Sequence, residues 1–416
     1  MYLTELGFEV SHNIRATDAP PIPQASEWAR KYTPTPSRPL LDMSQGVPGI
    51  PPPLEFFDAL VGASQSPESV KYGSIAGDFG LRSALVGEMK GVYGEHIDVD
   101  ANDISLTAGC NMAFLATIMA VCDSGDEVIL PVPWYFNHQM SLTMLGIKPI
   151  PLHSFPEDGF IPSVERCSRL ITERTKAIAL VTPNNPTGAI YPPSILLSFT
   201  LLAQKHRLPL ILDETYRDFI TTGPPHALFT DLPLLSSPNS WSWRTNIIHL
   251  FSFSKSYCIP GHRLGAVVAA PALQRHIRTV LDSMQICPPR SVQLALAPLL
   301  PSFRPFIRTM ASELEARHAL FRALLPGEWR VGAQGGYFAF VRHPFSGVSA
   351  KTVCRVLAEE WGVVFLPAEF FGYGGSADAE EGRWMRVAVA NVSDEAVRMA
   401  CQRLKEHLGA TQWTID

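Results

Sequence analysis

Between about residues 103 and 270, short apolar runs alternate with stretches of helical spacing. The apolar runs are rich in Val, Ile and Leu, which is typical of strands buried on both faces of a sheet. They cover residues 104–107, 127–131, 177–182, 209–212, 247–251 and 264–269. Helical segments such as 112–121 and 193–206 separate several of them. This alternation predicts an α/β fold with a mostly parallel sheet flanked by helices.

The flanking segments have a different character. Prolines cluster before residue 53, which predicts an extended N-terminal arm with a short helix near residues 25–31. After residue 271 the spacing is helical to about residue 324, and strands and helices then mix to the end of the chain. We therefore expect an arm with part of a small domain at 1–60, a large domain at 61–300 and a smaller α+β domain at 301–416.

Composition excludes several classes of function. The formal net charge is -5 and no basic block is present, so nucleic acid is not expected as a partner. No apolar run is long enough to span a bilayer. The seven cysteines are scattered without a CxxC pair, which favours a reducing compartment and argues against a zinc site. The first ten residues contain Glu5 and Glu9 and resemble no secretory signal, so we expect a cytoplasmic location.

The segment 252–265 follows an apolar run and reads SFSKSYCIPGHRLG. It places Lys255 between serines, and a lysine at a strand end can have its pKa lowered and act as a nucleophile. Ser252 and Arg263 could bind a phosphate beside it. A solvated lysine on a surface turn is an equally good interpretation of this segment alone. The sharper hypothesis is a lysine that forms a Schiff base with a phosphorylated carbonyl cofactor.

Two further turns follow predicted strands. Gly109, Cys110 and Asn111 lie where a strand passes into a helix, and the free amides of a helix start can bind an anion. An ordinary helix start is the plainer alternative. The hexapeptide PNNPTG at 183–188 forms a tight turn that can aim the amide of Asn185 into a cleft.

Asp213, Tyr135 and Arg386 each have a possible role in a binding site and a plainer structural alternative. Asp213, at the end of a predicted strand, needs a partner such as a cationic pyridinium nitrogen, and Tyr216 could reach the same ring; a helix cap with a packing tyrosine is the alternative. Tyr135, next to Trp134, could stack on a flat ring or could simply pack. Arg386 interrupts a strand pattern and suits either a carboxylate ligand or an internal salt bridge.

With the motifs NNPTG, DETY and SFSKSY…PGHRLG in this order, the chain from about residue 42 onward resembles the pyridoxal-phosphate enzymes of fold type I, and within them the class I/II aminotransferases. The resemblance implies their architecture, a large domain with a mostly parallel sheet and a smaller α+β domain. It implies pyridoxal 5′-phosphate as the cofactor, an amino acid and a 2-oxo acid as substrates, and a homodimer with shared active sites.

The resemblance also implies a role for each matching residue. Lys255 would hold the cofactor as an aldimine and move a proton, Asp213 would pair with the ring nitrogen, and Tyr216 and Asn185 would contact the phenolic oxygen. The remaining matches are phosphate contacts at Gly109, Cys110, Asn111, Ser252 and Arg263, ring stacking at Tyr135, a contact with the neighbouring subunit's phosphate at Tyr72, the substrate carboxylate at Arg386 and Asn185, and the substrate pocket at Gly46.

The sequence departs from the family pattern in the segment LPAEF, where Ala368 and Glu369 replace the more usual Pro-Gly continuation. Glu369 could face the substrate or the solvent. Arg290 and Arg244 are the available candidates for binding a second carboxylate, and neither is placed by a motif, so a specialised aspartate enzyme is not supported. Because the cofactor motifs do not decide the reaction, a lyase or a cyclase similar to ACC synthase remains the alternative to an aminotransferase.

Overall fold

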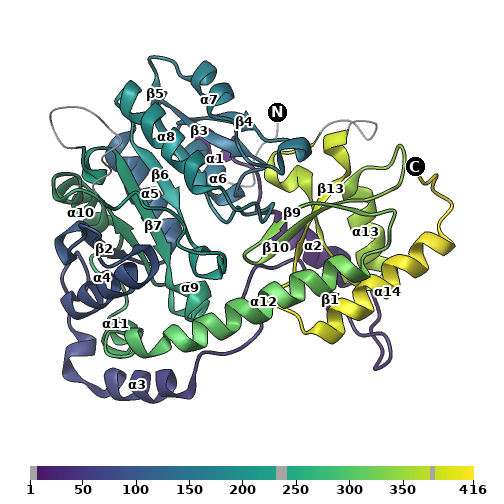
Figure 1. Cartoon of the computed structure of the whole chain (residues 1–416), viewed down its shortest axis with the longest axis horizontal. Helices are drawn as coiled ribbons and strands as arrows, with labels where there is room; N and C mark the ends of the chain where they lie inside the picture. The colour runs from purple at the N-terminus through teal and green to yellow at the C-terminus, as the bar shows by residue number, and fades with distance from the viewer. Residues whose placement is uncertain (1–6, 231–240, 375–379) are drawn as a thin grey trace.

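The computed structural model describes residues 7–230, 241–374 and 380–416. Residues 1–6, which form part of the segment expected to lack a secretory signal, lie outside the described residues. In the described ranges, no helix is long and apolar enough to cross a membrane. The chain forms a larger unit and a smaller unit, each built around its own sheet (Figure 1). The domain boundaries expected near residues 60 and 300 stay a prediction.

A seven-stranded sheet forms the centre of the larger unit (Figure 1). From edge to edge its strands are β2 (Ile104–Thr107), β8 (Gly265–Val268), β7 (Ile247–Ser252), β6 (Leu210–Asp213), β5 (Thr175–Val181), β3 (Glu127–Val132) and β4 (Lys148–His153). The pairs between β7, β6, β5, β3 and β4 are parallel, whereas β8 is antiparallel to both of its neighbours. The mostly parallel sheet predicted from the sequence is therefore confirmed.

Helices cover both faces of this sheet, which explains why its strands are apolar throughout. Alternate residues of the strands point to opposite faces, and each set joins a different cluster of buried side chains. One face carries α5 (Cys110–Val121), α6 (Phe136–Met144) and α10 (Pro271–Gln285). The other carries α4 (Phe79–Tyr93), α7 (Val164–Leu170), α8 (Pro193–His206) and α11 (Arg290–Leu296), with α3 (Leu54–Gln65) packed on α11.

Strand β4 was not predicted from the sequence. Its six residues, KPIPLH, contain Pro149 and Pro151, and proline removes a backbone donor from a sheet. The structure places β4 at the edge of the sheet, next to β3, where a proline can be accommodated because one side of the strand has no partner. The prolines therefore mark an edge strand and not a loop.

The smaller unit has a four-stranded antiparallel sheet in the order β12 (Leu366–Pro367), β13 (Trp384–Ala388), β10 (Phe338–Arg342) and β9 (Arg330–Gly335). A parallel pair, β1 (Leu41–Asp42) and β11 (Val363–Val364), lies beside it. Its helices are α2 (Pro21–Ala29), α13 (Ala350–Trp361) and α14 (Asp394–Ala410). The long helix α12 (Arg304–Leu324) extends along both units (Figure 1). The remaining short helix of the arm, α1 (His12–Arg15), contacts α6.

Candidate active site

A cavity of about 210 Å³ lies between the two units, at the carboxyl ends of β5, β6 and β7. This end of an open α/β sheet is where such folds bind ligands, because the strand ends and helix starts converge there. The larger unit contributes the ends of three strands and the starts of α5 and α6. The smaller unit closes the cavity with Phe338 and Arg386, and the arm adds Ile22 and residues 45–47. We call it the catalytic cavity below.

Lys255 lies in the short helix α9 (Phe253–Ser256), directly after β7, and its side chain faces the cavity. Its Nζ donates a hydrogen bond to the carbonyl oxygen of Gly46 at 2.7 Å. Burial, together with the charges of Arg263 and Arg386, lowers the pKa of Lys255 to about 8. Near neutral pH a useful fraction of this lysine is therefore the neutral, nucleophilic amine.

Asp213 ends β6 and turns its carboxylate into the same cavity. Its Oδ1 accepts hydrogen bonds from the backbone N–H and the hydroxyl of Thr215, at 3.0 and 2.7 Å. Its Oδ2 lies 3.2 Å from Nε2 of His138. Burial acts to raise the pKa of Asp213, but these contacts outweigh it and the pKa is lowered. Asp213 is thus a buried anion, suited to a cationic ring nitrogen.

His138 was missed by the sequence interpretation. It lies on α6 and its ring stacks on Phe114 with centroids 3.8 Å apart. Its edge also contacts Tyr135, three residues earlier. The i, i+3 spacing from Tyr135 is the signal that could have suggested it, since such residues share a helix face.

Ser252, Ser254, Arg263 and the first residues of α5 gather at one end of the cavity. Gly109 is the N-cap of α5 with φ +86°, and a Cβ there would collide with the guanidinium of Arg263. A Cβ on Gly265 would lie 2.6 Å from the carbonyl carbon of Gly109. These two glycines therefore allow the helix start and Arg263 to converge, which makes an anion site.

The sequence interpretation placed five residues in this group. Cys110, Asn111, Ser252 and Arg263 line the cavity, whereas Gly109 is the N-cap of α5 and does not line it. The sequence interpretation did not assign Ser254, whose side chain is also buried there. The SxSK spacing was the available signal, because alternate residues around a strand end can face the same side.

Tyr135, Tyr216 and Asn185 also line the cavity. The hydroxyl of Tyr135 donates to Asn111 Oδ1 at 3.3 Å, which fixes the ring at the cavity wall. Trp134 points elsewhere and covers Gly372, so the structure resolves which of the two neighbouring aromatics faces the cavity. Burial raises the pKa of Tyr216, which keeps its hydroxyl protonated and able to donate.

Arg386, on β13, is buried and lines the cavity. Its Nη1 donates to Asn185 Oδ1 at 2.9 Å and its Nη2 to the carbonyl of Ser44. The guanidinium lies over the rings of Phe338 and Phe371, at 4.5 and 4.9 Å. Among the described residues no carboxylate forms an ion pair with it, and its Nε has no partner. Burial lowers its pKa to about 10. The salt-bridge alternative is therefore not observed, and the arginine is available to an incoming anion.

Phe338 is a second residue that the sequence interpretation missed. Its ring lies against Gly46, so that any side chain at position 46 would collide with it. Gly46 itself lines the cavity as predicted, and its backbone carbonyl meets Lys255. The strand pattern around Phe338 predicted a buried residue and gave no sign of a role at the site.

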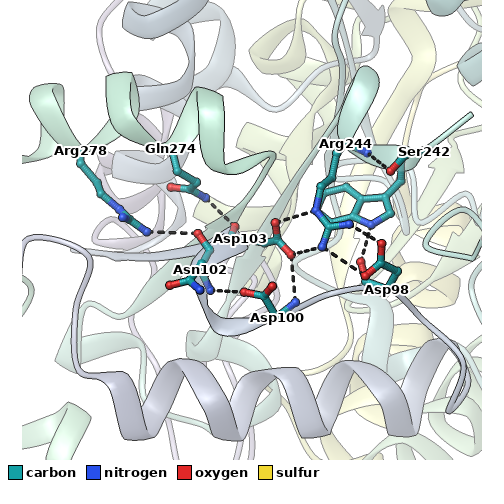
Figure 2. Close-up of polar contacts among 9 residues, drawn as sticks. Asp98, Asp100, Asn102, Asp103, Ser242, Arg244, Gln274 and Arg278 are labelled. Atoms are coloured by element: carbon teal, nitrogen blue, oxygen red, sulfur yellow. Dashed lines mark hydrogen bonds and ion pairs between the residues drawn. The ribbon is translucent and has the colours of Figure 1, made fainter.

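Tyr72 does not line the cavity and is 81% exposed. The two spare arginines also lie elsewhere. Arg290 is 3.5 Å from Asp78. Figure 2 shows Arg244 bound by Asp103, at 2.8 and 2.6 Å, and by Asp98. Neither arginine is free to bind a carboxylate of a substrate in this chain's cavity.

Residues 38–404 match the family model described as aminotransferase class I and II. The chain is 28% identical to an arginine–pyruvate transaminase from Pseudomonas aeruginosa, over 88% of this chain and 89% of the relative. It is 26% identical to an aromatic aminotransferase from Arabidopsis thaliana, over 95% of both chains. The solved structure of aspartate aminotransferase from Thermus thermophilus with maleate has the same fold, with a TM-score of 0.80, 24% identity and coverage of 96% of this chain and 99% of that one.

Proposed function

The chain belongs to the class I and II aminotransferase family and is an aminotransferase; on this premise we propose that it binds pyridoxal 5′-phosphate, the cofactor of that family, in the catalytic cavity through Lys255. The observation that carries the proposal is that one cavity is lined by a buried lysine of lowered pKa and by a buried arginine with no carboxylate partner among the described residues. Lys255 is the nucleophile for a carbonyl, and Arg386 is the site for a carboxylate.

The residues present fit this cofactor at three points. The start of α5, with Ser252, Ser254 and Arg263, suits its phosphate. Asp213 is a buried anion whose hydrogen bonds leave it facing the cavity, as a protonated ring nitrogen requires. Lys255 lines the same cavity as both groups and would hold the aldehyde.

Pyridoxal phosphate, when bound, supplies an electron-withdrawing ring that accepts the electron pair left by a broken Cα–H bond. Asp213 keeps the ring nitrogen protonated. Lys255, as a neutral amine, takes the proton from Cα of the amino acid and returns it on the way to the product. Tyr216 supplies a protonated hydroxyl in the cavity for the phenolic oxygen. Asn185, on the same wall, is already tied to Arg386 and can contact both that oxygen and the substrate.

Arg386 holds the substrate's α-carboxylate with its planar fork, and Asn185 fixes the orientation of that fork. Fixing the carboxylate orients the Cα–H bond toward Lys255. Among the described residues of this chain, the cations lining the cavity are Lys255, Arg263 and Arg386, each with a task already described. This lining therefore offers no further cation for a carboxylate in the substrate side chain. The relatives reported above are aminotransferases, and nothing in the site favours the lyase or cyclase alternative.

The test is a half-reaction with no acceptor. Purified protein loaded with pyridoxal phosphate is incubated with single amino acids, and we expect about one 2-oxo acid per active site, with the cofactor converted to its amine form. Repeated release of ammonia by the same protein would contradict the proposal. Borohydride reduction followed by mass spectrometry should place the cofactor on Lys255. The Lys255→Ala variant should lose this label, whereas Lys205→Ala, at an exposed lysine of α8, should keep it.

We further propose a homodimer with shared active sites. Apolar side chains are exposed on α3 and in the segment after it, among them Leu54, Val61 and Val70, next to the exposed Tyr72. Such a surface is unusual for a monomer and suits a subunit contact. Sedimentation should give a dimer. If Tyr72 reaches the partner's phosphate, mixing Lys255→Ala with Tyr72→Phe subunits should restore some sites of full affinity for the cofactor; an active monomer would contradict this.

The cytoplasm is proposed as the compartment. All seven cysteines are free in the structure, which suits a reducing environment. Labelling of thiols in protein isolated from its native source should find the cysteines reduced.

A further inference from the structure

A second cavity, of about 510 Å³, adjoins the catalytic cavity. It lies between α2, the start of α6 and the short helix η8 (Ala368–Phe371). The two cavities share Phe136. On α2, Ile22 lines the catalytic cavity, while its neighbours Pro21 and Pro23 line the second. A side chain that passes Phe136 and Ile22 would therefore enter the second cavity, which we call the distal cavity.

Glu369 gives the distal cavity a carboxylate with an unused acceptor. Its Oε1 accepts a hydrogen bond from the backbone N–H of Lys351 at 3.4 Å. Its Oε2 is shielded from solvent and has no hydrogen-bond partner among the described residues. Burial raises the pKa of Glu369, and backbone hydrogen bonds from Glu369 itself and from Lys351, with the charge of Lys351, offset this only in part. Burying a carboxylate with few donors is costly, so a cationic donor that enters the distal cavity beside Glu369 would be stabilised there.

The rest of the lining suits a cation. No lysine or arginine lines the distal cavity within the described ranges, and Asp18 and Glu27 add carboxylates at its exposed rim. Trp134, Phe136 and Phe370 supply aromatic surface. Aromatic faces attract a guanidinium or ammonium group, and a guanidinium also stacks on them because it is planar.

The distal cavity is also correctly placed for a substrate held by Arg386. The guanidinium of Arg386 lies 4.9 Å from the ring of Phe371, and the ring of Phe371 is 5.9 Å from that of Phe136. Glu369 precedes Phe371 by two residues on η8. One short helix thus borders both the carboxylate site and the distal cavity, and a single long amino acid can occupy both.

We propose that the distal cavity receives the positively charged end of the amino donor's side chain, which donates hydrogen bonds to Glu369, so that the enzyme prefers long basic amino acids such as arginine. This rests on the proposed function, because Arg386 must hold the α-carboxylate. Glu369, which the sequence left facing either substrate or solvent, is assigned to the substrate.

The experiment compares arginine with citrulline, which has the same length but an uncharged urea group. Second-order rate constants for the half-reaction are measured with the loaded enzyme, for wild type, Glu369→Gln and Glu360→Gln. Glu360 is an exposed residue of α13 outside both cavities and is the matched control. In wild type we expect arginine to react at least about tenfold faster than citrulline. Glu369→Gln should lower the arginine constant about 10- to 100-fold, as expected for a charge-assisted hydrogen bond, and change the citrulline constant less than about twofold.

Equal constants for arginine and citrulline in the wild type would overturn the inference, and so would an equal loss of both in Glu369→Gln. Thermal unfolding would reveal a variant that fails to fold. In that case the comparison of arginine with citrulline in the wild type still tests the inference. Turnover of neutral amino acids with no preference for arginine overturns the inference and leaves the proposed function standing. If no amino acid forms a 2-oxo acid, both the proposed function and this inference are wrong. Lysine in a parallel assay distinguishes an ammonium from a guanidinium preference.

Discussion

Replacing Arg386 by Gln should weaken substrate use far more than it weakens the fold. The guanidinium is buried, faces the catalytic cavity and has no carboxylate partner among the described residues. A bound α-carboxylate would add two charge-assisted hydrogen bonds, each contributing about 1.5–3 kcal/mol. Loss of both, with a carboxylate left in a site without a cation, costs about 3–5 kcal/mol. At about 1.4 kcal/mol for each factor of ten, kcat/KM should fall roughly 10²- to 10⁴-fold.

The stability cost of the same change is smaller. Arg386 now satisfies Asn185 Oδ1 and the carbonyl of Ser44, and a glutamine can retain one of these contacts. About 1–2 kcal/mol of unfolding free energy should be lost, as for one neutral hydrogen bond and the packing on Phe338. Arg386→Lys keeps the charge but lacks the fork, and should cost about tenfold in kcat/KM or more.

The assay is the half-reaction rate as a function of amino-acid concentration, measured beside cofactor binding and thermal unfolding. Arg342→Gln is the control, because Arg342 lies on the neighbouring strand β10 and pairs with Glu380 and Asp416 away from the cavity. It should keep wild-type kinetics. If Arg386→Gln binds cofactor normally and retains kcat/KM within about threefold for amino acids and for 2-oxo acids, the carboxylate assignment is wrong.

Three other outcomes are expected. The cofactor-free protein should attach pyridoxal phosphate about tenfold more slowly for each pH unit below about 8, and the rate should level off above pH 8. The reason is that the attacking form of Lys255 is neutral and its pKa is about 8. A rate still rising steeply at pH 10 would contradict the lowered pKa. Asp213→Asn should bind cofactor yet lose roughly 10²- to 10³-fold in half-reaction rate, since a buried ionic partner is removed; a change below about fivefold would remove Asp213 from its role. Gly109→Ala should weaken cofactor binding at least about tenfold in titrations, because its Cβ collides with Arg263. Gly94→Ala is the control, because Gly94 also has a positive φ but faces open space. It should lower the free energy of unfolding by about 1 kcal/mol or more and leave cofactor binding unchanged.

Much of the fold followed from local patterns, since buried parallel strands are continuous apolar runs and most of the helices here have regular spacing. Strand β4 escaped because its prolines contradict the usual strand composition. In the site, residues within the recurring motifs, such as Lys255 and Asp213, could be placed from sequence because the chain order of strand ends sets their positions. Phe338 could not, because its role arises from its contact with Gly46, which is distant in sequence. For His138 the only signal was its i, i+3 spacing from Tyr135, and its contact with Asp213 joins segments distant in sequence.

The distal cavity is a second example of a site that the sequence could not reveal. Glu369 was visible as a departure from the family pattern, but its surroundings come from three separate segments: α2, the start of α6 and η8. Only their assembly shows that a carboxylate oxygen is shielded and has no donor among the residues that the structure describes.

The prolines of β4 have a consequence for how this sheet can grow. The N–H of Lys148 donates toward the β3 side, to Asp126, so the backbone groups of the alternate residues Pro149 and Pro151 face outward. The outer rim of the sheet therefore presents carbonyl oxygens without the donors that an added strand would need. Newly made chains with this edge exposed are protected against pairing edge to edge into aggregates. Association of two folded copies through the β4 edge is therefore disfavoured, which is consistent with the contact proposed at the exposed apolar residues around α3.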